Sequence, residues 1–445
     1  MRRLLLWVAL AASLRAQPDP AELLLRVRDR VLNTVDRLPR YLCTQTVDRA
    51  QYEPSGIVGE TNCAELDRLR GIRYVPIRTT ADRLRLDVGV AHGREAYSWV
   101  GENRFGDQSL FDIVRNGAVS TGYFHGFLAL VFRSDQASFS FVGESTAGGR
   151  KLFEYQFDVP VEASHYIYRT GGGAYTTAYE GTMRADAETA DLVELAVRTR
   201  NMPPETNTCE VSTSMKYGRW RANDADFLLP TETNMRIRDG NAVELQNRTV
   251  YTGCHEFLGE STLHFGPPDT KVVATQGAKL TTAPDATAIP GGLQFTVKLA
   301  QDIEVATAAA GDPVKALLAT DLRDGRKLLA ATGTPVTCRI QLIRRYYSAQ
   351  SGRTLGAYEP TAKVDLQLRL ESLAAPTGPR PITARPFTPP ASPLRRRPGT
   401  LAHRPISLGT LSTLDLNVWS TRFDNAGDDY VIKSGLAMEW MTSTR

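Results

Sequence analysis

Residues 152–158 read Leu-Phe-Glu-Tyr-Gln-Phe-Asp, and this stretch indicates the fold class. Its three aromatic residues, Phe153, Tyr155 and Phe157, are each followed by a polar or acidic residue. Because successive side chains of a strand point to opposite faces of a sheet, the alternation predicts a strand with one apolar and one polar face. Such strands are typical of an antiparallel sheet that water wets on one side.

The same alternation recurs along the chain between residues 84 and 197. It places nine rings on what we expect to be consecutive strands: Phe139, Phe141, Phe153, Tyr155, Phe157, Tyr166, Tyr168, Tyr175 and Tyr179. These rings either pack against covering helices as ordinary core, or they line an apolar cavity that binds an acyl chain. A buried chain of about 16 carbons would contribute on the order of 10 kcal/mol, at about 0.8 kcal/mol per methylene.

Few helices are expected beside these strands. Apolar residues from Leu23 to Val35 recur at three- and four-residue steps, which predicts an amphipathic helix that ends before Pro39. A second helix is predicted over 108–115, and periodicity leaves residues 123–132 undecided. The expected class is therefore mainly β, of the α+β type.

The amino terminus has the layout of a cleavable secretory signal over residues 1–16. Arg2 and Arg3 precede an apolar run, Leu4 to Ala12, that is about half of the roughly 20 residues a membrane span requires. A buried amino-terminal helix is the alternative. We expect the mature chain to have no transmembrane span and to reside in the periplasm or outside the cell. Its oligomeric state stays open.

Five cysteines fit an oxidising compartment, and none of them forms a CxxC pair. We favour disulfides that tie neighbouring segments, Cys43 with Cys63 and Cys209 with Cys254. Cys338 would then be left as a buried thiol. A bridge that closes about 20 to 45 residues should stabilise the fold by roughly 3–4 kcal/mol.

The sequence also predicts the net charge of the mature chain and its division into domains. The 445 residues carry 53 Lys and Arg against 49 Asp and Glu, a net charge of +4. Without Arg2, Arg3 and Arg15 of the signal, 50 basic residues face 49 acidic ones, so we expect no general attraction to nucleic acid. We predict a first domain over 17–266, a linker over 267–288 and a second β domain over 289–445.

Residues 376–405 interrupt the second domain. This stretch is rich in proline and arginine and has no acidic residue, which predicts a disordered insertion. It is either a solvated loop or a contact with an anionic envelope surface. In the second case Arg395, Arg396 and Arg397 would each contribute roughly 1 kcal/mol near charged lipid.

The first domain resembles the periplasmic lipoprotein-carrier superfamily of the LolA and LppX type. The resemblance rests on the helix that runs into residues 41–46, Tyr-Leu-Cys-Thr-Gln-Thr, and on residues 179–189, Tyr-Glu-Gly-Thr-Met-Arg-Ala-Asp-Ala-Glu-Thr. Ala190 and Asp191 stand where that superfamily has a turn glycine. The resemblance implies a curved antiparallel half-barrel sheet wrapped over helices, with an apolar cavity between them.

Residues 289–345 resemble a second type of unit, the small β-barrel module of TrbI-like envelope proteins. The match runs from the alternating strand at Leu293 to Leu299, through residues 309–314, to residues 328–336. Residues 330–333, Ala-Ala-Thr-Gly, lack the proline that is usual before the last strand. The resemblance implies a small barrel-like domain without an active site.

No residue set predicts catalysis, a metal or a cofactor. Ser145 and Ser261 miss the G-x-S-x-G pattern, and no two histidines have ligand spacing on a helix. Cys254-His255-Glu256 is better explained by a disulfide cysteine on a strand, where adjacent side chains point to opposite faces.

Three functions stay open from the sequence. The first is a non-enzymatic envelope protein that binds a lipid or a lipidated partner. The second is a structural envelope protein without a ligand, and the third is a hydrolase with unidentified carboxylates.

Overall fold

A computed structural model describes the chain in twelve stretches. They are residues 19–37, 40–54, 62–69, 76–91, 93–102, 105–106, 108–222, 225–256, 289–347, 362–376, 378–387 and 417–443. The predicted signal at 1–16, the predicted linker at 267–288 and Arg395 to Arg397 lie outside the described residues. We call residues 19–256 the first unit and residues 289–443 the second unit.

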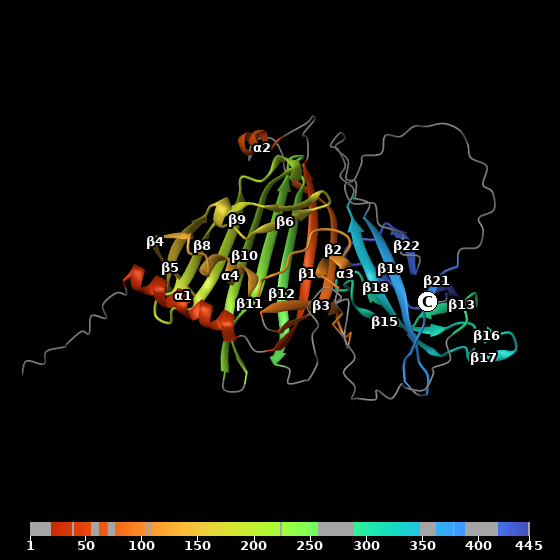
Figure 1. Ribbon diagram of the computed structural model, residues 1–445. Helices are drawn as coiled ribbons and strands as arrows, with labels where there is room; N and C mark the ends of the chain where they lie inside the picture. The colour runs from red at the N-terminus through yellow and green to blue at the C-terminus, as the bar shows by residue number, and fades with distance from the viewer. Residues whose placement is uncertain are drawn as a thin grey trace, which may run out of the picture.

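The first unit consists of a large antiparallel sheet and a few helices (Figure 1). Its helices are α1 (Pro20–Arg37), α2 (Cys63–Leu69), α3 (Leu110–Ile113) and α4 (Gly126–Phe132), with short 3₁₀ turns at Val161–Ala163 and Pro204–Thr206. Its strands are β1 (Tyr41–Pro54), β2 (Pro76–Ala91), β3 (Arg94–Trp99), β4 (Ser138–Ala147), β5 (Arg150–Val159), β6 (Ile167–Thr170), β7 (Gly173–Thr176), β8 (Ala178–Asp186), β9 (Leu192–Arg200), β10 (Thr208–Ala222), β11 (Ala225–Asp239) and β12 (Glu244–Glu256).

The pairing follows chain order except at one place. Neighbouring strands run β4-β5-β8-β9-β10-β11-β12-β1-β2-β3, all antiparallel. The return of β12 to the side of β1 brings the end of the unit next to its beginning. The hairpin β6–β7 forms a separate two-stranded sheet.

Alternation explains why one face of this sheet is covered. Along β1, from Tyr41 to Ala50, every second residue is buried. The buried face packs against α1 through Leu23, Val27, Val31 and Val35, and against α4, whose buried residues include Val131. Burial of each such aliphatic side chain stabilises the fold by about 1.5–3 kcal/mol. The predicted mainly β class and the predicted amino-terminal helix are both confirmed.

The second unit is a smaller antiparallel sheet with short hairpins. Its strands are β13 (Gln294–Leu299), β14 (Ile303–Glu304), β15 (Pro313–Leu318), β16 (Leu322–Asp324), β17 (Lys327–Ala330), β18 (Pro335–Tyr346), β19 (Lys363–Leu373), β20 (Arg380–Pro381), β21 (Ala384–Pro386), β22 (Val418–Asp424), β23 (Val431–Ile432) and β24 (Ala437–Thr442).

Its ladder runs β22-β19-β18-β15-β13-β24-β21. No pairing joins β22 to β21 among the described residues, so the sheet is not a closed barrel. The resemblance of residues 289–345 to the TrbI-like module stays a prediction.

Two expectations about local order need correction. Residues 378–387 belong to the stretch that we predicted to be disordered, yet β20 pairs with β19 and β21 pairs with β24. Ile382 and Ala384 are buried there, so this piece gains enough apolar contact to fold. Tyr168 and Tyr175 do not lie on the main sheet, because they pair with each other in the β6–β7 hairpin.

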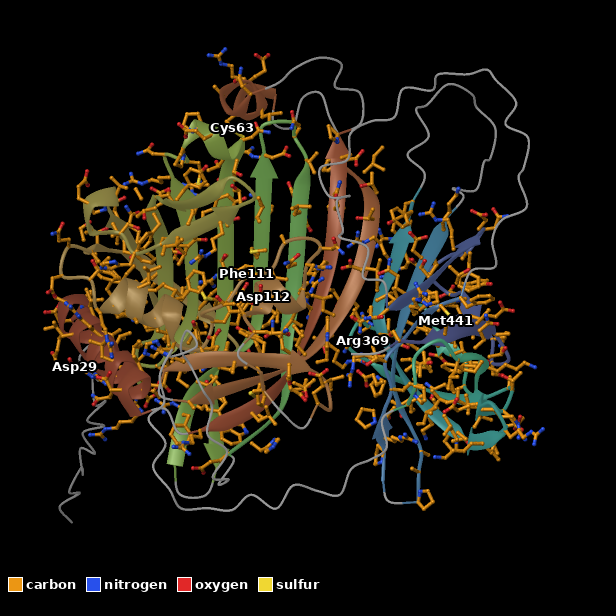
Figure 2. The ribbon with its side chains drawn as sticks, turned by 45° about the vertical axis from the view of Figure 1, so that its right-hand side comes forward. Asp29, Cys63, Phe111, Asp112, Arg369 and Met441 are labelled. Carbon is orange, nitrogen blue, oxygen red and sulfur yellow. A yellow bond between two sulfur atoms is a disulfide. The ribbon has the colours of Figure 1, made fainter. Side chains whose placement is uncertain are left out.

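The disulfide pairing that we favoured is wrong. Cys43 is bonded to Cys254, and Cys63 is bonded to Cys209, while Cys338 is a buried free thiol. The first bond joins β1 to β12, which are neighbours in the sheet although 211 residues apart in sequence. The second joins α2 to β10 across 146 residues, and Figure 2 shows Cys63 at one end of the sheet. Loops of this length make each bond worth about 5 kcal/mol in the chain-entropy account.

Strand β2 joins the two units into one sheet. Its second half pairs with β3, and residues 80–82 pair with Tyr346 to Arg344 of β18. At the junction, Ala310 donates its amide to the Arg83 carbonyl and accepts from the Arg85 amide, both at 2.8 Å. Arg369, labelled in Figure 2, lies 3.9 Å from Glu102 of the first unit.

A buried carboxylate fixes this junction. Asp82 accepts two hydrogen bonds from Arg49 at 2.7 and 2.9 Å, and two from Arg344 at 3.1 and 2.8 Å. Burial alone would raise the pKa of Asp82, but the two guanidinium groups outweigh it and lower the pKa below its usual value. The carboxylate is therefore ionised in the folded chain at neutral pH.

No helix within the described residues has the length and apolar character needed to cross a bilayer.

We predict that Asp82→Asn destabilises the chain by about 3–5 kcal/mol at pH 7, because it leaves the buried Arg49 and the partly buried Arg344 without their anion. The folded pKa of Asp82 lies below the unfolded one, so its contribution is present above about pH 4 and is lost as the pH falls further. Urea unfolding at pH 7 and at pH 3 should therefore show a smaller difference between wild type and variant at pH 3. An equal difference at both pH values would contradict the assignment. Asp135→Asn, in an exposed pair with Arg28, is the control and should change little.

We also predict that Gly311→Ala weakens the junction. Gly311 has φ +103°, and a Cβ there would lie 2.1 Å from the Arg85 carbonyl oxygen. Gly435→Ala is the matched control, since its φ of +89° is similar and no atom lies within 4 Å of the added carbon. The free energy of unfolding should fall by about 1–3 kcal/mol more for Gly311→Ala than for the control. Equal losses would mean that backbone strain alone is responsible.

Candidate functional site

A hollow of about 1180 Å³ lies over the sheet of the first unit. Residues of eight neighbouring strands border it, from β5 through β8–β12 and β1 to β2, and β18 adds Arg345. This volume is slightly larger than that of a usual small-molecule pocket, about 300–1000 Å³. The hollow is therefore the main candidate for a binding site in the described part of the chain.

Two rows of side chains cross the strands side by side and line the hollow. The first row contains, in register, Ala81, Ala50, Gln246, Arg236, Ser212, Arg198, Glu180 and Asp158. The second row contains Arg83, Asp48, Arg248, Asn234, Ser214, Ala196, Thr182 and Gln156. Because both rows alternate with buried residues along their strands, they occupy the polar face of the sheet, opposite the helices.

Ion pairs hold the charged members of the first row. Arg236 lies 3.2 Å from Glu210, and Arg198 pairs with Glu180 and lies 3.7 Å from Glu210. Arg200 pairs with Asp158 at the end of the row. These carboxylates therefore compensate the arginines locally, and the row is not an uncompensated cationic patch.

The second row has one charged end. Arg83 lies 2.5 Å from Asp48, and Arg248 lies 2.5 Å from Glu232. Hydrogen bonds from the Asn234 amide and from Arg248 lower the pKa of Glu232 to about 2. Glu232 therefore keeps its charge over the physiological pH range, and Arg248 keeps its partner.

The rest of the second row is uncharged. We call Asn234, Ser214, Ala196, Thr182 and Gln156 the neutral stretch. Within the described residues, no hydrogen bond engages the side chains of Ser214, Thr182 or Gln156. Hydroxyl and amide groups can donate and accept hydrogen bonds, so the neutral stretch offers both functions to a ligand.

The nine aromatic residues predicted as a ligand site occupy other places. Phe153, Tyr155, Phe157 and Tyr179 are buried in the core of the first unit, and of the nine only Phe157 also borders the hollow. Phe139 and Tyr166 are partly buried against this core. Phe141 is 42% exposed, and Tyr168 and Tyr175 lie half-buried in the β6–β7 hairpin.

The buried rings contact one another and the helices. Phe139 packs on Phe157 with centroids 5.6 Å apart, and Phe141 packs on Phe153 at 5.2 Å. Tyr155 donates its hydroxyl to the Pro20 carbonyl at 2.7 Å, and Tyr179 donates to the Leu130 carbonyl at 2.8 Å. These rings thus contact one another and the helices, and their role as a ligand site stays a prediction.

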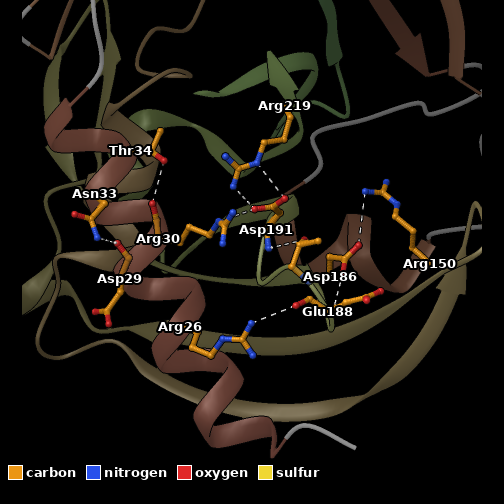
Figure 3. A network of polar contacts seen from close by, with 11 residues as sticks. Arg26, Asp29, Arg30, Asn33, Thr34, Arg150, Asp186, Glu188, Asp191 and Arg219 are labelled. Atoms are coloured by element: carbon orange, nitrogen blue, oxygen red, sulfur yellow. Dashed lines mark hydrogen bonds and ion pairs between the residues drawn. The ribbon is translucent and has the colours of Figure 1, made fainter. Parts of the chain in front are cut away.

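We call the side of the sheet that carries Phe153, Tyr155, Phe157 and Tyr179 the ring face. A polar network also fastens α1 over this ring face (Figure 3). Asp191, in the turn between β8 and β9, lies 2.9 Å from Arg30 of α1 and accepts a hydrogen bond from Arg219 at 3.0 Å. Burial would raise the pKa of Asp191, but Arg219 and Arg30 outweigh it and lower the pKa. Arg26 of α1 donates to the Glu188 carbonyl at 3.2 Å. Arg30 and Arg26 thus tie α1 to the turn between β8 and β9.

A second buried carboxylate positions α4. Glu95 on β3 accepts hydrogen bonds from the Gly122 amide at 2.6 Å, from the Phe124 amide at 3.0 Å and from the Tyr97 hydroxyl at 2.5 Å. Burial raises the pKa of Glu95 more than these donors lower it. The contact fixes the chain just before α4, and it belongs to the core rather than to the hollow.

Sequence reasoning did not find the hollow. The polar residues that line it were visible as the second half of each alternating pattern, and they were interpreted only as a wetted face. Their assembly into rows depends on which strands are neighbours, which the alternation within one strand does not specify.

No known protein family and no curated protein matches this sequence. Similar solved structures include the following three. A DUF1329 family protein from Desulfovibrio piger has 10% identity and a TM-score of 0.26, over 55% of this chain and 96% of that chain. A LolA superfamily protein from Nitrosomonas europaea has 5% identity and a TM-score of 0.24, over 52% and 93%.

The third structure is a putative outer membrane lipoprotein-sorting protein domain from Vibrio parahaemolyticus. It has 7% identity and a TM-score of 0.25, over 53% of this chain and 93% of that chain.

Proposed function

We propose that this chain is a non-enzymatic binding protein of the cell envelope that holds an uncharged polar ligand in the hollow. The observation that supports this proposal best is the double row of side chains across eight strands, all of which line the hollow. The rows are fixed by strand register, so the site is formed before the ligand arrives. The proposal gives no residue a catalytic role.

The neutral stretch supports the choice of ligand chemistry. An uncharged ligand with hydroxyl or amide groups would meet the side chains of Ser214, Thr182 and Gln156 without displacing an ion pair. A bare hydrocarbon would have to remove water from the neighbouring ion pairs and hydroxyls without replacing their hydrogen bonds, which is unfavourable.

Two features support the compartment. The predicted signal at residues 1–16 directs the chain out of the cytoplasm. The bonds Cys43–Cys254 and Cys63–Cys209 are of a kind that persists in an oxidising environment. We therefore place the chain in the periplasm or outside the cell, where Arg395 to Arg397 would provide the contact with an anionic envelope surface.

An acyl chain or a lipidated partner on the ring face is a second candidate. One observation favours it, namely that Phe141 contacts Phe153 and Tyr155 and is nevertheless 42% exposed. Phe141 therefore extends the cluster of buried aromatic rings to the surface of the first unit. Binding there would require α1 to move away from the sheet.

We predict that Ala196→Trp abolishes ligand binding, because the indole would fill the middle of the neutral stretch without entering the core. The measurement is native mass spectrometry of the full mature chain purified from its own envelope. We expect wild type to carry an adduct rich in hydroxyl or amide groups, and the variant to lack it. Thr252→Trp is the control, because Thr252 is exposed on β12, further along the same face, and does not line the hollow.

The possible results of this mass spectrometry distinguish ligand binding in the hollow, lipid binding on the ring face and a structural role without a ligand. An adduct that persists in Ala196→Trp would refute the hollow as the site, and an adduct with fatty acyl chains would support the ring face instead. A bare polypeptide in wild type would favour a structural envelope protein without a ligand.

A further inference from the structure

Strand β4 is a free edge of the large sheet. It pairs with β5 on one side, and among the described residues no strand pairs with it on the other (Figure 1). An unpaired edge presents a row of amide and carbonyl groups to any chain that can align with it. Proteins usually protect such edges with charged residues or proline.

Within β4, Glu144 is the one charged residue, and none of its residues is a proline. Residues 136–143 read Gln-Ala-Ser-Phe-Ser-Phe-Val-Gly, with no charge and no proline. Val142 is 55% exposed and Phe141 is 42% exposed. A bulge interrupts the pairing with β5 between Phe141 and Gly143, which leaves Ser138 to Phe141 as a regular strand.

We propose that a second copy of this chain binds here, β4 against β4, antiparallel, with the two-fold axis at Ser140. Ser140 then faces Ser140 of the other copy and Phe139 faces Phe141, and both pairs lie within the regular part of the strand. The same patch serves both copies, as a closed two-fold interface requires. The proposal goes beyond ligand binding in the hollow and does not depend on it.

The rings select this register. A pairing that keeps the apolar faces on the same side must place the axis at a residue and not between two residues. An axis at Phe139 would set Phe141 opposite Ala137, and an axis at Phe141 would set Phe139 opposite Gly143. With the axis at Ser140, each of the two rings meets a ring.

Neighbouring strands and charges agree with the same register. Phe139 pairs with Phe157 and Phe141 pairs with Tyr155 on β5, so the aromatic row would continue from one copy into the other. The regular part of the strand, Ser138 to Phe141, contains no charged residue. No like charges stand opposite each other, which would be unfavourable.

The polar face would continue as well. Ser140 pairs with Gln156, the last member of the neutral stretch. At the axis, Ser140 of each copy would join the two neutral stretches into one uncharged row. The second copy would thus extend the polar surface beside the hollow.

Cysteine cross-linking of the full mature chain tests the register. In Ser140→Cys, the two cysteines face each other across an antiparallel pair, where Cβ atoms lie about 4.5–5.5 Å apart, so mild oxidation should form a covalent dimer. Ser138→Cys is the control, since residue 138 lies two positions from the axis and does not face itself. A soluble, folded Ser140→Cys that stays monomeric under oxidation would refute the proposal, and so would equal cross-linking of Ser138→Cys.

Analytical ultracentrifugation tests the interface without added thiols. Val142→Lys should weaken self-association at least tenfold, because it places a charge on the edge. Ile167→Lys is the matched control, since Ile167 is also an aliphatic residue with 55% exposure but lies on β6. It should leave the dissociation constant unchanged. A wild-type chain that stays monomeric at all concentrations, or equal weakening by both variants, would overturn the proposal.

Discussion

The in-and-out alternation of side chains along the strands is the constraint on which the structure of the first unit depends. Each long strand supplies one row to the core and one to the polar face. The helices α1 and α4 must cover the apolar face, because a sheet with that much exposed apolar surface would not be stable alone. The hollow lies on the other, polar side of the sheet.

The junction of the two units also serves the hollow. Arg344 and Arg345 are adjacent on β18, so their side chains point to opposite faces of the sheet. Arg344 binds the buried Asp82, and Arg345 borders the hollow and lies 3.3 Å from Asp428. Arg78 of the first unit lies 3.4 Å from the same Asp428. The second unit therefore contributes to the rim of the hollow, and the buried contact that fastens the units also positions this rim.

Local patterns predicted local structure, and long-range contacts were not predictable from them. The three- and four-residue spacing of apolar residues from Leu23 to Val35 predicted α1, and the alternation at 152–158 predicted β5. Both patterns depend only on residues that are close in sequence. The pairing of Cys43 with Cys254 depends on β12 lying beside β1, and nothing within either segment specifies that neighbour. The hollow was not predicted for the same reason, since its two rows form only when the eight strands are neighbours in this order. Tyr168 and Tyr175 alternate as the other rings do, yet Gly171 to Gly173 allow a tight hairpin that leaves the main sheet.

The charges of the hollow bear on which ligands it can select. A cleft lined by one sign of charge attracts the opposite charge from a distance. Here Arg236, Arg198 and Arg248 each have a carboxylate partner, and the hydrogen bonds to Glu232 keep that partner ionised. The field of each pair falls off quickly, so long-range attraction contributes little to ligand capture. Under the proposed function, selection would come from contact with an uncharged ligand whose groups match the hydroxyls and the amide of the neutral stretch.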